Sequence, residues 1–138
     1  MKLINKLSIV VSVYNEEAVL DKFYETILPI LEGIDSDYEL IFVNDGSRDA
    51  SPAILDRLAM DSKKVKVIHF SRNYGHEAAM IAGIDYSSGD GIVCMDADLQ
   101  HPVECIPQIL DTFNQGYEVI SMVRTCLLYT SDAADDGE

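Results

Sequence analysis

The sequence predicts an α/β fold with a Rossmann-like, mostly parallel sheet and flanking helices. Apolar, β-branched runs alternate with segments of helical periodicity along the chain, which is typical of parallel sheets. A polar cluster follows each apolar run, as expected if all strands end at one edge of the sheet. The 138 residues, 48% of them hydrophobic, suffice for one domain with a buried core. If the strand order is 3-2-1-4, a crevice opens between the first and fourth strands.

The first two strand–helix units are predicted as follows. Residues 7–13 are apolar nearly throughout, which predicts a buried strand. Apolar residues at helical spacing predict a helix over residues 19–32, with acidic residues in its first turn and Gly33 near its end. Residues 38–43 predict a second strand that leads into a turn. A serine and a proline are expected to cap and open the helix over residues 51–61.

The remaining units continue the alternation. Residues 65–70 predict a third strand, and the alanine-rich residues 76–86 predict a helix whose small side chains let it approach the sheet closely. Residues 91–95 predict a strand buried on both faces. A helix is expected over residues 102–115, because proline opens it and glutamate lies in its first turn. A fifth strand is expected over residues 118–123.

The composition excludes several classes of partner and location. The formal net charge is −14, from 24 acidic and 10 basic residues, so direct electrostatic binding to nucleic acid or an anionic membrane is not expected. The three cysteines lack the spacing of a zinc site, which favours a reducing compartment and a cytoplasmic location. No run approaches the roughly 18 apolar residues of a membrane span, and the amino terminus lacks a secretion signal.

The last thirteen residues are set apart from this pattern. Residues 126–138 resemble the in-frame translation of a transposon adapter used to prepare sequencing libraries. We therefore expect residues 1–125 to form the domain, cut in its middle, and residues 126–138 to be a non-native, disordered tail. The alternative is a native disordered acidic tail.

Two carboxylates follow the central strand, separated by one alanine. Asp96 and Asp98 repel each other by roughly 4 kcal/mol at about 4 Å and an effective dielectric of about 20, unless a cation intervenes. With the amide oxygen of Gln100 in reach, the donor set favours Mg²⁺ or Mn²⁺ over zinc. The alternative is that these carboxylates cap the helix that begins at Pro102.

The sequence lacks the motifs of other classes of nucleotide- and phosphate-binding proteins. A dinucleotide-binding enzyme needs Gly-x-Gly-x-x-Gly after the first strand, where this chain has Tyr14-Asn15-Glu16-Glu17, and no Gly-Lys-Ser/Thr phosphate loop occurs. A metal-dependent nucleotidyltransferase usually has a basic glycine-rich loop, which is also absent from the sequence. A phosphoacceptor signalling module stays a remote alternative, although arginine stands at Arg124 where a lysine is usual.

Residues 7–125 resemble the nucleotide-binding half of the inverting, GT-A fold glycosyltransferases of family 2, truncated. They are most similar to the branch that transfers sugars to polyprenyl phosphates such as dolichyl and undecaprenyl phosphate. Ser12 stands where proline is usual, and Asn44 stands where aspartate is common, which leaves the base preference open. The matching motifs are Val13-Tyr14-Asn15-Glu16, Asn44-Asp45-Gly46-Ser47, Arg72-Asn73-Tyr74-Gly75 and Asp96-Ala97-Asp98-Leu99-Gln100-His101-Pro102.

The resemblance implies roles for individual residues. Asp45 would accept hydrogen bonds from the base or ribose, Asp96 would contact the sugar or ribose, and Arg124 would lie against phosphate. The alternatives are a turn-forming role for Asp45, a packing role for Tyr14, a loop-fixing role for Arg72 and a surface charge for Arg124. The implied substrate-binding residues are Val13, Tyr14, Glu16, Asp45, Ser47, Arg72, Asn73, Gly75 and Asp96. The implied catalytic residues are Asp96, Asp98 and Arg124, and the implied metal ligands are Asp98 and Gln100.

The function implied by the resemblance is transfer of a sugar from a nucleoside-diphosphate sugar to a polyprenyl phosphate, with inversion and with Mg²⁺ or Mn²⁺ as cofactor. The alternative is a soluble family 2 enzyme that acts on a glycan or polysaccharide hydroxyl and needs a carboxylate base. Because the part that resembles the family is expected to stop near Thr125, before an acceptor-binding half, we expect this chain by itself to be inactive. The complete protein would lie at the cytoplasmic face of the membrane through segments beyond this sequence.

Overall fold

The computed structural model describes residues 5–97, 103–114, 120–122 and 128–130. Its centre is a four-stranded sheet of β1 (Lys6–Val13), β2 (Asp37–Asn44), β3 (Val65–His69) and β4 (Gly91–Asp96). The strand order is β3-β2-β1-β4 and every pairing is parallel, which confirms the predicted 3-2-1-4 order.

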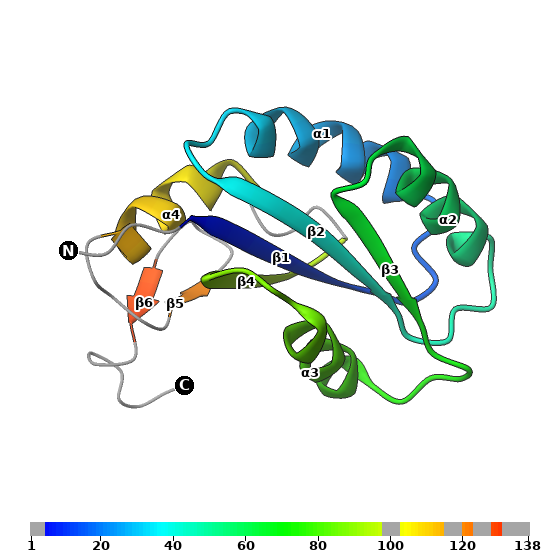
Figure 1. Ribbon diagram of the computed structural model, residues 1–138. Helices are drawn as coiled ribbons and strands as arrows, with labels where there is room; N and C mark the ends of the chain where they lie inside the picture. Colours follow the sequence, from blue (N-terminus) through cyan, green and yellow to red (C-terminus); the bar gives the residue numbers. More distant parts are fainter. Residues whose placement is uncertain (1–4, 98–102, 115–119, 123–127, 131–138) are drawn as a thin grey trace.

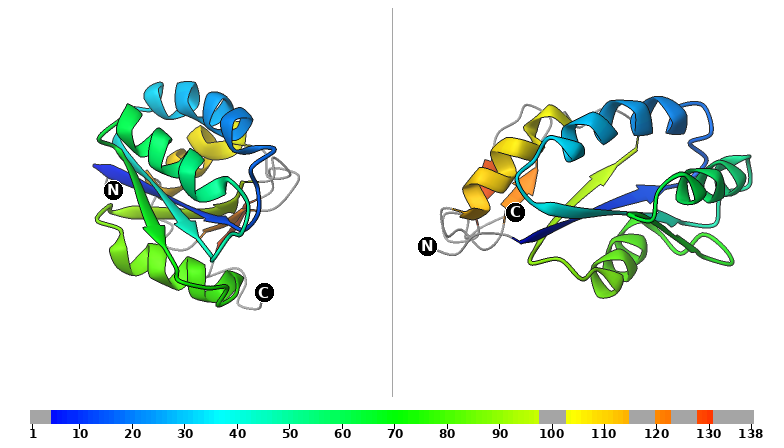
Figure 2. Two further views of the ribbon diagram at one scale, coloured as in Figure 1. Left: turned by 90° about the vertical axis from the view of Figure 1, so that its right-hand side faces the viewer. Right: turned by 45° about the horizontal axis from the view of Figure 1, so that its top comes forward.

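Three helices cover one face of this sheet and one helix covers the other (Figures 1 and 2). The first group comprises α1 (Leu20–Glu32), α2 (Ser51–Asp61) and α4 (Ile106–Asn114), and α3 (His76–Tyr86) lies on the opposite face. The predicted bounds of the helix at 76–86 are confirmed, and those of the helix at 51–61 likewise. None of the described helices is long and apolar enough to cross a membrane.

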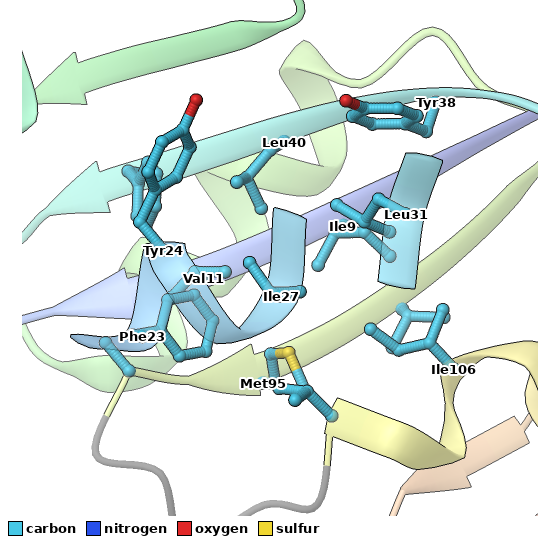
Figure 3. Close-up of a cluster of buried hydrophobic side chains, with 14 of the residues drawn as sticks. Ile9, Val11, Phe23, Tyr24, Ile27, Leu31, Tyr38, Leu40, Met95 and Ile106 are labelled. Atoms are coloured by element: carbon cyan, nitrogen blue, oxygen red, sulfur yellow. The ribbon is translucent and has the colours of Figure 1, made fainter. Parts of the chain in front are cut away.

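The larger core lies between the sheet and α1, α2 and α4. Phe23, Ile27 and Leu31 of α1 are fully or almost fully buried and gather over Ile9 and Val11 of β1 (Figure 3). Side chains alternate between the two faces of a strand, so every second residue of β1 faces this core. The helix spacing predicted from the sequence thus places one apolar face of α1 on the sheet.

The opposite core is smaller because α3 packs very closely on the sheet. A Cβ atom added to Gly83 would lie 2.3 Å from Cγ1 of Val10 and 3.2 Å from Cγ2 of Val43. Ala79, one turn earlier, is fully buried against the same strands. The small residues of α3 therefore set the distance between helix and sheet, as the sequence predicts.

Three details differ from the sequence predictions. β4 is buried on one face and only half-buried on the other, because it is an edge strand of this sheet and α3 packs over β1 and β2. Ser51 is not the cap of α2: Ala50 holds that position, and Ser51 is already helical. The helix expected from residue 102 begins as a 3₁₀ turn, Val103–Cys105, before α4, because Pro107 has no N–H to bond the carbonyl four residues earlier.

The described part of the expected fifth strand, residues 120–122, does not join the parallel sheet. β5 (Ile120–Met122) pairs antiparallel with β6 (Leu128–Thr130) in a separate two-stranded sheet. Residues 128–130 therefore form a strand within the segment predicted to be a disordered tail. An antiparallel partner so near in sequence needs only a short connection, which lowers the entropic cost of pairing.

Candidate active site

The ends of the parallel strands bring four sequence motifs to one edge of the sheet. Val13 pairs in register with Asn44, Asn44 with His69, and Ser12 with Asp96. The polypeptide segments that follow these residues therefore begin side by side. This is the edge at which open α/β sheets bind ligands.

A cleft of about 390 Å³ lies at this edge. Three of its lining residues, Glu16, Asp45 and Asp96, carry carboxylates, so the cleft has an acidic wall. Six of the eight lining residues were predicted as site residues from the sequence, and Ser12 and His76 were not. The lining residues are Ser12, Tyr14, Glu16, Asp45, Asn73, Gly75, His76 and Asp96.

Asp45 organises one wall of the cleft. Its side chain is buried, and the residue is 2% exposed. One carboxylate oxygen accepts hydrogen bonds from the backbone N–H of Tyr74 at 2.7 Å and of Gly75 at 3.2 Å. The other accepts from Asn73 Nδ2 and from Gly75 N–H, both at 3.1 Å. The carboxylate of Asp45 thus holds the 73–75 segment, a contact that neither the implied ligand-binding role nor the turn-forming alternative includes.

Gly46 lets the chain turn tightly against this same segment. Its φ of +72° is a backbone conformation that favours glycine. A Cβ atom at this position would lie 2.2 Å from the carbonyl carbon of Arg72 and 2.3 Å from the nitrogen of Asn73. The Asp-Gly pair therefore joins the segment after β2 to the segment after β3, through a carboxylate on one side and a close backbone contact on the other.

The segment after β1 is fastened to the segment after β2 by hydrogen bonds. Asn15 adopts a φ of +53°; its N–H donates to Ser47 Oγ at 2.9 Å, and its Oδ1 accepts from Arg48 N–H at 2.8 Å. Glu16 N–H donates to Ser51 Oγ at 2.9 Å, which explains why Ser51 is buried without capping its helix. The tyrosine and glutamate of the first motif are thus held at the mouth of the cleft.

Asp96 forms a pair that the sequence reasoning did not identify. Its Oδ1 lies 2.8 Å from Nε2 of His76, the first residue of α3. The two side chains are 34% and 58% exposed, so the pair is open to solvent and to a ligand in the cleft. His76 directly follows the Arg-Asn-Tyr-Gly motif, and this adjacency is the signal that could have identified it.

A second hollow of about 480 Å³ shares Tyr14 and Asn73 with the cleft, and contains the predicted residues Ser47 and Arg72. The guanidinium of Arg72 lies 4.6 Å from the ring centroid of Tyr74. Hydrogen bonds from Arg72 and Ser71 lower the pKa of the Tyr74 hydroxyl. These contacts favour the loop-fixing alternative for Arg72.

Four predicted residues are placed in neither the cleft nor the second hollow. The side chain of Val13 is fully buried in the larger core, and its carbonyl accepts from Asp45 N–H at 2.8 Å. Val13 therefore helps to position Asp45 and does not line the cleft itself. Asp98, Gln100 and Arg124 lie outside the described residues. Within the described residues, no three His, Cys, Asp or Glu side chains form a group that could hold a metal ion.

Comparison with known proteins places this geometry in a family. The model of glycosyl transferase family 2 matches residues 8–127. A bactoprenol glucosyl transferase of Shigella phage SfV is 38% identical over 96% of this chain and 41% of its own length. An undecaprenyl-phosphate 4-deoxy-4-formamido-L-arabinose transferase of Proteus mirabilis is 40% identical over 88% of this chain and 37% of its own length. An uncharacterized glycosyltransferase of Bacillus subtilis, YkcC, is 48% identical over 86% of this chain and 36% of its own length.

Solved structures share the fold. Glucosyl-3-phosphoglycerate synthase of M. tuberculosis has a TM-score of 0.62 and 25% identity, covering 81% of this chain and 42% of the other. A mannosyltransferase of Pyrobaculum calidifontis in complex with GDP-Man and Mn²⁺ has a TM-score of 0.58 and 20% identity, covering 77% of this chain and 32% of the other. The chain spans about two fifths of the length of the curated relatives named above. With its parallel sheet and the motifs gathered at one edge, the chain belongs to glycosyl transferase family 2.

Proposed function

We propose that this chain is the nucleotide-sugar-binding part of an inverting glycosyltransferase whose acceptor is a polyprenyl phosphate. The observation that carries the proposal is the meeting of four separate motifs in one cleft at the carboxyl edge of the sheet. Relatives that are named for bactoprenol and undecaprenyl phosphate support the acceptor. A matching structure with bound GDP-Man supports a nucleoside-diphosphate sugar as donor.

The described residues suit a bound donor. Tyr14 is 43% exposed at the mouth of the cleft, where its ring can cover a base or ribose. Asp45, already satisfied by the 73–75 segment, keeps that wall in place while Asn73 and Gly75 line it. Asp96 and its partner His76 lie across the cleft, within reach of ribose or sugar hydroxyls.

The chemistry of the donor set fits Mg²⁺ or Mn²⁺. Asp96, Asp98 and Gln100 supply carboxylate and amide oxygens and no sulfur, and hard divalent cations prefer oxygen ligands. Asp98 and Gln100, which continue the chain from β4, would hold the ion. When bound, the ion neutralises the negative charge that develops on the diphosphate as the bond to the sugar breaks.

Asp96 and Arg124 would orient the donor and the acceptor. Asp96 fixes the sugar or ribose, and Arg124 would lie against phosphate as the acceptor approaches from the opposite side of the anomeric carbon. A polyprenyl phosphate is already ionised, so it needs alignment and no general base. A glycan hydroxyl would need a carboxylate to remove its proton, so the two acceptors make different demands on the protein. The complete enzyme would work at the cytoplasmic membrane face, where its lipid acceptor lies.

Donor binding tests the first part of the proposal. Calorimetry with UDP-GlcNAc and with GDP-Man, each with and without Mn²⁺, should show metal-dependent binding of one donor to the 138-residue chain. Asp98→Ala should abolish the metal dependence, because one fewer carboxylate is left to hold a hard ion. Asp35→Ala, an exposed aspartate in the loop between α1 and β2, is the matched control and should bind like the parent chain. Unchanged metal-dependent binding by Asp98→Ala contradicts the assignment of Asp98 as a metal ligand.

A chimera tests the acceptor. Residues 8–125 would replace the corresponding part of the bactoprenol glucosyl transferase of Shigella phage SfV, which matches 96% of this chain with 41% of its own length. We expect transfer of sugar to undecaprenyl phosphate in membranes, and loss of that transfer when the chimera also carries Asp98→Ala. Transfer to a glycan hydroxyl in place of the lipid phosphate would support the soluble family 2 alternative.

A further inference from the structure

Three hydrogen bonds connect α2 to the turn that carries Asp45. Asp56 Oδ1 of α2 lies 2.8 Å from Nε2 of His69, at the end of β3. Nδ1 of the same imidazole lies 2.9 Å from Nδ2 of Asn44, at the end of β2. Asn44 Oδ1 in turn accepts from the backbone N–H of Ser47 at 2.9 Å.

The chemistry of these atoms fixes the form of the imidazole. The N–H of Ser47 can only donate, so it selects the oxygen of the Asn44 amide and leaves the Asn44 NH₂ to face His69. Because that NH₂ group is a donor, Nδ1 of His69 must carry a lone pair. The proton of the neutral ring then lies on Nε2 and is donated to Asp56.

These three hydrogen bonds act on the cleft indirectly, because none of the four residues that form them lines the cleft. Asn44 and Ser47 bracket Asp45 and Gly46, so the bond from Ser47 N–H to Asn44 closes the turn around the two residues that hold the 73–75 segment. Asn44 is 3% exposed, so an unpaired Asn44 NH₂ group would carry a desolvation cost.

We propose that His69 is a positioning residue of the donor site, and that it acts in its neutral, Nε2-protonated form. The inference rests on the proposed function for its link to donor binding. Neutral His69 holds the Asn44 amide so that its oxygen closes the turn, and the turn holds Asp45 against the 73–75 wall.

Protonation of His69 should loosen the turn. A proton on Nδ1 would oppose the Asn44 NH₂ group, and rotating the amide to present oxygen to the imidazolium would remove the acceptor for Ser47 N–H. Three charged groups line the hollow that contains His69: Asp56 from α2, Arg48 from the segment after β2 and Arg72 from the segment after β3.

Nuclear magnetic resonance of the 138-residue chain tests the proposal without a ligand or a variant. At about pH 8, long-range ¹H–¹⁵N spectra should show His69 as the Nε2–H tautomer. As the pH is lowered until the ring signals of His69 report its protonation, the amide signals of Ser47, Tyr74 and Gly75 should shift together with them. An Nδ1–H tautomer, or Ser47, Tyr74 and Gly75 signals that do not follow the ring, overturns the proposal.

Donor binding supplies the second readout. His69→Leu removes the acceptor for Asn44 and should weaken binding of UDP-GlcNAc or GDP-Man, whichever binds, by roughly tenfold. His69→Asn places a side-chain oxygen near the position of Nδ1 and should restore most of this loss. Its affinity should lack the fall that accompanies protonation of His69 in the parent chain. Parent-like binding by His69→Leu overturns the positioning role. If neither donor binds the parent chain, the proposed function fails, and the resonance experiment still decides whether His69 holds the turn.

Discussion

Glu39 is the most consequential buried charge in the described structure, and its removal is predicted to destabilise the fold. It is 1% exposed on β2, near the strand ends opposite the cleft. Its carboxylate accepts from Lys66 Nζ at 2.7 Å, from Ser8 Oγ at 2.6 Å and from Ser88 N–H at 2.7 Å. Ser88 lies between α3 and β4, so one side chain ties together β1, β2, β3 and the entry to the strand that carries Asp96.

The magnitude follows from the pKa of this carboxyl. Burial alone raises the pKa of Glu39, but the hydrogen bonds from Lys66, Ser8 and Ser88 outweigh burial and lower the pKa from 4.5 to about 2. At about 1.4 kcal/mol per unit, ionised Glu39 contributes about 3 kcal/mol to stability. Because the pKa is lowered in the folded state, this contribution is complete above pH 4.5 and declines as the pH falls toward 2. About 2 kcal/mol of it should be lost by about pH 3.

Urea denaturation followed by circular dichroism, between about pH 7 and pH 3, measures this contribution. Glu39→Gln should be about 3 kcal/mol less stable than the parent chain near pH 7, and the difference should shrink by about 2 kcal/mol at about pH 3. Glu25→Gln, at an exposed position of α1, is the matched control and should show neither effect. A difference between Glu39→Gln and the parent chain that stays constant with pH would refute the reasoning.

Two glycine substitutions test the close contacts of the fold and of the site. Gly83→Ala places a methyl group 2.3 Å from Cγ1 of Val10 and should lower the free energy of unfolding by about 1–3 kcal/mol. Gly33→Ala, where the nearest atom would lie 3.4 Å away, is the control and should lower it less. Equal losses in a denaturation experiment would contradict the close packing of α3. Gly46→Ala combines a φ of +72° with a contact of 2.2 Å to Arg72, so it should weaken nucleotide-sugar binding measured by calorimetry more than about tenfold. Parent-like binding by that variant would show that the turn does not shape the donor site.

The sequence by itself determined the parts of this protein that depend on local pattern. Uninterrupted β-branched runs predict buried parallel strands, and the first four of the five predicted strands form the main sheet. The small residues of residues 76–86 predict a helix in close contact with the sheet, and Gly83 makes that contact. Polar motifs placed after successive strands predict a shared edge, because parallel strands all end on the same side.

Only the tertiary structure decided what each polar residue contacts at that edge. The sequence leaves open which groups the Asp45 carboxylate contacts, and the approach of the 73–75 segment gives it partners in its own chain. His69 and Asp56 are unremarkable in the sequence until strand pairing and the packing of α2 place them beside Asn44. Residues 120–122, expected in the parallel sheet, likewise pair antiparallel with residues 128–130, because a partner near in sequence costs little chain entropy. Periodicity specifies which face of an element is buried, whereas hydrogen-bond partners far apart in sequence are selected only when the packed elements bring them together.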